Sequence, residues 1–253
     1  MFRQATVVFH ENLKCFWHVE QKFKFRGITA LLKSLFYPSF KYPKVSPVPG
    51  KKRSGSYGMR RGTTVDRQLC KLARGETVQK MHPFATAAWS ALMESGLRPV
   101  DGQVVVFDDT SKLATGIDIL CFEANRDEPV LIEVKCSSVA ATDTTTQRMR
   151  GCLSDWYSCL QNQYVLQAAM TRILFERTFQ CRASAYVLHV GDTCTRLTRV
   201  PRLAVFDQAY NELVEHAATA PPVRRPKRKQ KTAKKPKTGR VKKTIKRKVE
   251  KKH

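Results

Sequence analysis

Two short apolar segments contain three charged side chains at positions that a strand would bury. The segments Gly116–Phe122 and Val130–Cys136 are bounded by polar residues, which predicts two strands joined by the polar loop EANRDE. Successive side chains of a strand point to opposite faces, so Glu133 and Lys135 share one face, and Asp118 lies on the preceding strand. An unpaired buried charge is very costly. If the face that carries these charges meets the core, the fold must therefore give each of them a partner.

Asp118 and Glu133 can lie opposite each other on the two strands. Two carboxylates at close range repel, and a divalent cation with a preference for oxygen ligands, Mg²⁺ or Mn²⁺, relieves the repulsion. Lys135 would then lie beside the cation, where it can orient or deprotonate a water or stabilise negative charge on a phosphate. The alternative is an ordinary cross-strand Glu–Lys pair on a solvated face.

Helices are predicted before and after these strands from apolar periodicity, caps and glycine stops. Between them lie a further strand at Gln103–Phe107 and one at Ser184–Val190. This order of elements predicts a mixed α/β domain with helices packed on a central sheet. The predicted helices are Arg26–Leu35, the segment from the cap at Gly62-Thr63-Thr64 to Gly75, the segment from His82-Pro83 to Gly96, Ser154–Phe179 and Asp207–Ala217.

Positive charge is concentrated at the C-terminal end. The 253 residues carry a formal charge of +25, and the segment from Val223 to His253 holds 17 Lys or Arg and one acid, a local +16. Such a segment cannot bury a core, so we expect a disordered basic tail. Charge of this kind favours a polyanion, DNA first, as the partner. Arg224–Lys229 and Lys234–Lys237 resemble nuclear-import signals, which predicts a nuclear location.

Several classes of protein are not expected. No run approaches the roughly 18 consecutive apolar residues of a membrane span, and the first residues lack the apolar core of a signal peptide, so neither a membrane protein nor a secreted protein is predicted. The eight cysteines form no CxxC pair and lie at no zinc-finger spacing relative to histidine. We expect reduced thiols.

The spacing of the charged residues resembles a known family. Asp118, fourteen intervening residues, and then Glu133-Val134-Lys135, with Gly116 two residues before the aspartate, resembles the active-site pattern of the PD-(D/E)xK nuclease superfamily. Within it, the pattern is most similar to the RecB-type and phage lambda-type exonucleases, including the mitochondrial genome maintenance exonuclease.

Weaker motifs agree with that resemblance, which covers roughly Arg26–Val190. Gly27–Leu32 resembles the short helix that often opens these domains. Arg61–Asp66 resembles the clade's early motif Gly-Thr-x-x-His, with Asp66 at the usual place of histidine. The resemblance implies a restriction-endonuclease-like core over 26–220, an N-terminal extension over 1–25 and the tail over 221–253.

The resemblance also implies roles for individual residues. Asp118, Glu133 and the main-chain carbonyl of Val134 resemble the family's ligands for Mg²⁺ or Mn²⁺, and Lys135 its catalytic lysine. Asp66 would reach a second cation in place of the usual histidine. The alternative for Asp66 is a solvated helix residue paired with Arg67 or Lys71.

The long helix should carry the family's glutamine. Gln163 fits best, as a group that orients the lysine or a phosphate-bound water, with Gln167 an alternative one turn on. Gln163 can instead be an exposed amide. Asp155, two turns earlier in the predicted helix, is a possible substitute.

Nucleic-acid contacts are expected from basic residues near the early helix. Arg60 and Arg61 precede its predicted N-terminus at Gly62, where free backbone N–H groups favour a phosphate, and Lys51, Lys52 and Arg53 extend this positive region. The whole predicts a Mg²⁺-dependent deoxyribonuclease, an exonuclease acting on DNA ends in replication, recombination or repair. The rival is a non-catalytic DNA-binding protein on the same scaffold. The oligomeric state stays open.

Overall fold

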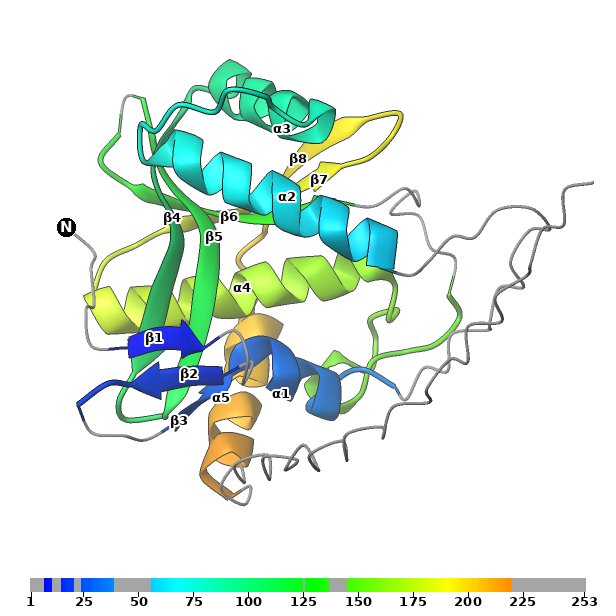
Figure 1. Cartoon of the computed structure of the whole chain (residues 1–253). Helices are drawn as coiled ribbons and strands as arrows, with labels where there is room; N and C mark the ends of the chain where they lie inside the picture. The colour runs from blue at the N-terminus through cyan, green and yellow to red at the C-terminus, as the bar shows by residue number, and fades with distance from the viewer. Residues whose placement is uncertain are drawn as a thin grey trace, which may run out of the picture. The chain divides into compact units, whose positions relative to one another are not determined.

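The computed structural model describes residues 7–10, 15–20, 24–38, 56–124, 126–136 and 145–219 (Figure 1). The loop Lys51–Arg53 and the tail from Val223 lie outside the described residues. The elements in chain order are β1 (Val7–His10), β2 (Cys15–His18), β3 (Lys24–Gly27), α1 (Ile28–Leu35), α2 (Ser56–Ala73), α3 (Pro83–Glu94), β4 (Leu97–Asp108), β5 (Leu113–Glu123), β6 (Pro129–Cys136), the 3₁₀ turn η1 (Gly151–Leu153), α4 (Leu160–Phe179), β7 (Ser184–Val190), β8 (Thr195–Arg199) and α5 (Ala204–Thr219).

A mixed sheet of eight strands forms the centre of the fold. Its order is β1-β2-β3-β5-β6-β7-β8, with β4 paired to β5, and the β3–β5 and β6–β7 pairs are parallel. The predicted strands and the mixed α/β class are confirmed. Strands β3 and β8 were not predicted. Arg26 and Gly27, the first two residues of the predicted helix, belong to β3, and the segment 1–25, expected as an extension, supplies β1 and β2.

Helices cover both faces of this sheet (Figure 1). α2 and α3 pack on one face, where Val65, Leu69 and Ile132 belong to one core cluster. α4 packs on the other face together with α1 and α5, and Leu131 belongs to that second cluster. Adjacent residues of β6 therefore face opposite layers, as the predicted alternation requires. In the part of the chain that the structure describes, no helix is both long and apolar enough to span a membrane.

The predicted start of the early helix is wrong. α2 begins at Ser56, six residues before Gly62, so Gly62 lies inside the helix. The hydroxyl of Thr64 donates to the carbonyl of Arg60 one turn earlier (3.0 Å), which is a mid-helix bond and not a cap. The predicted end is confirmed, since Gly75 follows Ala73 with φ of 75°. Arg60 and Arg61 therefore lie inside α2 and not before its N-terminus.

The long helix also starts later than predicted. Residues 154–159 after η1 are not helical: Tyr157 forms an isolated bridge with Arg148, the N–H of Ser158 donates to the carbonyl of Gln147 (2.8 Å), and α4 begins at Leu160. Asp155 is exposed and lies outside the helix. The prediction that it shares a helical face with Gln163 is wrong.

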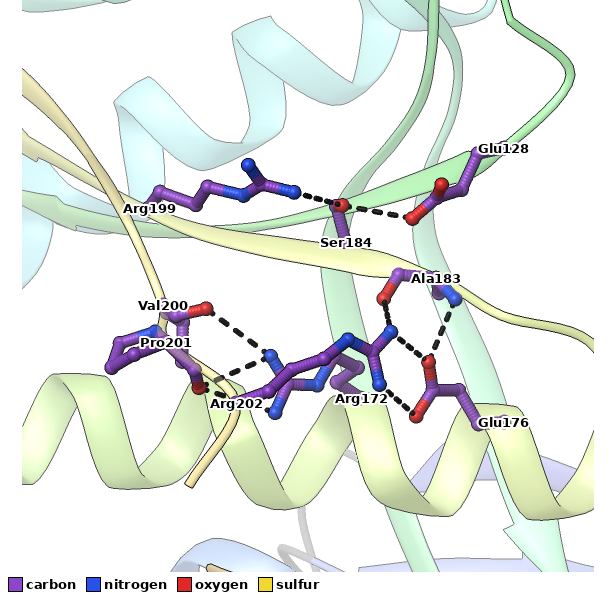
Figure 2. A network of polar contacts seen from close by, with 9 residues as sticks. All are labelled: Glu128, Arg172, Glu176, Ala183, Ser184, Arg199, Val200, Pro201 and Arg202. Atoms are coloured by element: carbon purple, nitrogen blue, oxygen red, sulfur yellow. Dashed lines mark hydrogen bonds and ion pairs between the residues drawn. The ribbon is translucent and has the colours of Figure 1, made fainter.

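Arg172 fixes α4 to the connector between β8 and α5 (Figure 2). Its buried guanidinium donates to the carbonyls of Val200 (3.2 Å) and Pro201 (3.3 Å). Beside it, Arg202 binds both carboxylate oxygens of Glu176, also on α4. These polar contacts hold the position of α4 along the sheet.

Candidate active site

β5 and β6 part at the position of the three predicted charges. Their pairing covers Ile119 to Phe122 on β5 and ends at Ile119 and Ile132. Immediately beyond, the carboxylate of Asp118 accepts a hydrogen bond from the backbone N–H of Val134 (2.8 Å). A side chain of β5 thus takes the place of main-chain pairing with β6 beyond this point, and the two strands leave room between them.

Glu133 and Lys135 form a contact inside the protein. Glu133 is 5% exposed, and the ammonium of Lys135 donates to its carboxylate. The alternative of a Glu–Lys pair on a solvated face is therefore wrong. From α4, the amide of Gln167 donates to the same carboxylate oxygen (2.6 Å), and its carbonyl lies 3.4 Å from the Lys135 ammonium.

Asp66 comes to the same place from α2. This helix lies close against β4, because a Cβ on Gly102 would be 2.6 Å from the Cα of Cys70. Glycine permits that approach, and Asp66 lies one turn before Cys70 on the helix. The side-chain amide of Gln103, the next residue of β4, donates to Asp66 (2.9 Å) and to Asp118 (3.4 Å).

The carboxylates are electrostatically crowded. Burial, and next the charge of Asp118, raise the pKa of Glu133 to about 8 and that of Asp66 to about 6. Burial also raises the pKa of Asp118, against the opposing effects of Lys135 and the Val134 N–H. Burial lowers the pKa of Lys135, but Glu133 and Asp118 outweigh it and raise the value, so the lysine is a cation at neutral pH.

These side chains line one cavity of about 330 Å³. A second cavity of about 780 Å³ shares Asp118 and Gln167 and extends toward β1, β2 and α1. The arrangement places a lysine ammonium, a glutamine amide and three carboxylates around a cavity with room for a phosphate group.

The donors present suit a hard divalent cation. Asp66, Asp118 and Glu133 offer only oxygen ligands, and burial raises the pKa of each carboxyl above its ordinary value. Among the described residues, no group of three or more His, Cys, Asp or Glu side chains is placed so that these side chains alone could hold a metal ion. Glu133 is held instead by Lys135 and Gln167, so a cation would have to compete with them.

Three predicted residues, Gln163, Arg60 and Arg61, do not line this cavity. The amide of Gln163 donates to the carbonyl (3.0 Å) and the hydroxyl (3.2 Å) of Ser158, so Gln167, the alternative one turn on, is the glutamine at the site. Arg61 packs over the ring of Phe84 (4.5 Å to its centre) and lies 3.5 Å from Asp192. Arg60 is exposed.

Gln103 was missed by the sequence reasoning. Its position inside a predicted strand gave no chemical signal, because a polar residue is ordinary on the exposed side of a strand. The expected alternatives for Asp66, ion pairs with Arg67 or Lys71, are not the contacts found; Lys71 lies 3.9 Å from Glu76. Amide contacts of this kind depend on tertiary packing of α2 on β4.

No family model matches the chain, and none of the curated proteins compared with it is similar. Among solved structures, an alkaline exonuclease (LHK-Exo) from Laribacter hongkongensis is similar at 13% identity, with 76% of this chain and 85% of that chain covered and a TM-score of 0.38. A structure named SSO0001 is similar at 8% identity, with 64% of this chain and 86% of that chain covered and a TM-score of 0.32. At these TM-scores neither likeness establishes a family for the chain.

Proposed function

We propose that the chain is a metal-dependent nuclease that hydrolyses phosphodiester bonds of DNA, acting as an exonuclease at DNA ends. The observation that carries the proposal is the meeting of Asp118, Glu133 and Lys135 at one cavity where β5 and β6 part. These are the three residues of the D-x14-ExK pattern. Their convergence is what the resemblance to PD-(D/E)xK nucleases requires.

Each residue has a distinct task in the proposal. Asp118, Glu133 and the Val134 carbonyl would hold Mg²⁺ or Mn²⁺, which when bound supplies electrostatic stabilisation of charge on the phosphate. Lys135 is a cation beside Glu133, so it orients the attacking water and stabilises negative charge that develops on the phosphate. Gln167 contacts both Glu133 and Lys135 and fixes their mutual orientation.

The proposal is tested by digestion of end-labelled linear DNA and covalently closed circular DNA, each with Mg²⁺ or with EDTA. We expect degradation of linear DNA in Mg²⁺ only. Cutting of the circle would make the chain an endonuclease and overturn the end-directed part. No cutting of either substrate by folded protein would overturn nuclease activity.

The rival function is DNA binding without catalysis. It is favoured by the charge of +16 between Val223 and His253, which would bind a polyanion whatever the fold carries. A mobility-shift assay beside the digestion distinguishes the two functions, because a protein that only binds DNA shifts linear and circular DNA and cuts neither.

A further inference from the structure

We propose that Gln103 is a positioning residue for cation binding: its amide bridges Asp66 and Asp118 and holds the two carboxylates at the cavity. The inference rests on the proposed function. Its basis is the pair of hydrogen bonds from one amide nitrogen, 2.9 Å to Asp66 and 3.4 Å to Asp118. The two carboxylates come from different elements, α2 and β5, and Gln103 joins them from β4.

The backbone of Gln103 is strained. Three non-glycine residues in the described part of the chain have positive φ: Gln103 (54°), Lys112 (58°) and Gln180 (51°). Lys112 lies in the turn between β4 and β5, and Gln180 caps α4, both places where left-handed residues are common. Gln103 instead lies inside β4, between the pairs Gly102–Ile119 and Val104–Ile117.

A side chain at this position needs a reason other than packing. Gln103 is exposed, and its neighbour Gly116 has open space except for the Gln103 amide oxygen, 3.7 Å from where a Cβ would lie. Glycine adopts positive φ without strain, so the backbone conformation by itself favours glycine here. Strained residues persist where the surrounding structure uses them, often at functional sites.

An amide is the group that this role requires. It donates hydrogen bonds to carboxylates and carries no charge. A lysine or arginine in its place would neutralise the carboxylates and compete with a cation, whereas an acid would add to the repulsion between Asp66 and Asp118. The amide fixes both oxygens and leaves their negative charge available.

The test compares the full-length parent with Gln103→Gly by calorimetric titration of Mn²⁺ without DNA, and by thermal melting in EDTA. Loss of a hydrogen bond to charged groups should weaken Mn²⁺ binding about tenfold. Relief of strain and loss of the two hydrogen bonds act on the melting temperature in opposite directions, so it should change little. Weaker Mn²⁺ binding at a nearly parental melting temperature is a combination that a merely structural residue does not give.

Lys112→Gly is the matched control. This substitution removes the strain of a positive φ in the turn between β4 and β5, far from the carboxylates of the site in the chain's fold. It should therefore raise the melting temperature and leave the Mn²⁺ affinity unchanged. In an Asp66→Asn background, Gln103→Gly should have a smaller effect on affinity, because one of the two groups it holds is already neutral.

The outcomes separate the inference from the proposed function. A parent that binds no Mn²⁺ contradicts the proposed function and the inference together. A parent that binds Mn²⁺ with unchanged affinity in Gln103→Gly leaves the function standing and overturns the role of Gln103. Weaker Mn²⁺ binding that comes with a large fall in the melting temperature of Gln103→Gly also overturns it, because the residue would then be structural.

Discussion

The carboxylate of Asp118 accepts the backbone N–H of Val134 at 2.8 Å, just past the last paired residues of β5 and β6. This bond ties Asp118 to the strand that carries Glu133 and Lys135. It also holds the two carboxylates on either side of the opening between the strands, although burial and repulsion oppose the arrangement.

Asp118→Asn should abolish cleavage and preserve the fold. The amide oxygen of asparagine can still accept the Val134 N–H, while the charge that would bind a cation is lost. We expect the cleavage rate to fall by at least ~100-fold, with similar losses in Glu133→Gln and Lys135→Met. DNA binding in EDTA should be equal to the parent's or tighter, since a carboxylate no longer repels phosphate. Asp109→Asn, an exposed acid in the β4–β5 turn, is the control. If these variants cleave DNA like the parent, the active site must lie at other residues.

Two glutamines of α4 give a matched comparison. Gln167→Ala removes contacts with Glu133 and Lys135 and should slow cleavage roughly tenfold or more at saturating DNA, because an orienting hydrogen bond to charged groups is lost. Gln163→Ala removes bonds to Ser158 only and should keep the parental rate. Single-turnover rates with end-labelled DNA make the measurement. Equal losses in both variants would show that α4 stability, and not the Gln167 contacts, matters.

The contrast between these glutamines also shows which site residues could be predicted from the sequence. Asp118, Glu133 and Lys135 were found because strand alternation fixes their faces within a short segment. Choosing between Gln163 and Gln167 requires the rotation of α4 against the sheet. That rotation depends on where the helix starts, and the non-helical segment 154–159 displaced the start from Ser154 to Leu160. The apolar periodicity of this segment did not indicate that the helix starts at Leu160.

The same limit applies to the early helix. Val65 and Leu69, four residues apart on this helix, are both fully buried, as the apolar periodicity of the segment indicates. The start at Ser56 was missed because Gly62, Thr63 and Thr64 have the composition of a cap, although packing of α2 on β4 keeps them helical. Strand β8 was missed because its exposed residues lack a regular apolar alternation.

Stability without divalent cations should fall as pH rises. The pKa of Asp66 is raised from 3.8 to about 6, and that of Glu133 from 4.5 to about 8. The folded chain therefore binds protons at these two carboxyls more tightly than the unfolded chain does. This tighter binding stabilises the fold at pH values below the pKa values of the unfolded chain, and the stabilisation is lost as pH rises through the pKa values of the folded chain. Melting in EDTA at several pH values between about 4 and 9 measures the slope. The double variant Asp66→Asn, Glu133→Gln should have a flatter profile; a profile parallel to the parent's would mean that other groups cause the slope.

Deletion of Val223–His253 should weaken DNA binding and flatten its salt dependence, because this segment carries +16. For each DNA phosphate that the shortened chain no longer neutralises, the slope of log affinity against log salt should decrease in magnitude by about 0.9. Cleavage at low salt should persist. Binding titrations at several salt concentrations, with cleavage followed in parallel, check both statements. Loss of all cleavage by a truncated chain that is still folded would favour the rival function.

α4 contributes Gln167 to the cavity and, five residues later, Arg172 to the carbonyls of Val200 and Pro201 (Figure 2). The helix that orients Glu133 and Lys135 is thus anchored by a connector outside the residues that line the cavity. In a scan of all single substitutions, Arg172 should therefore rank with the cavity residues as a loss-of-activity position. Its partners are main-chain carbonyls, which every residue carries, so the connector can vary in sequence as long as its backbone keeps its course.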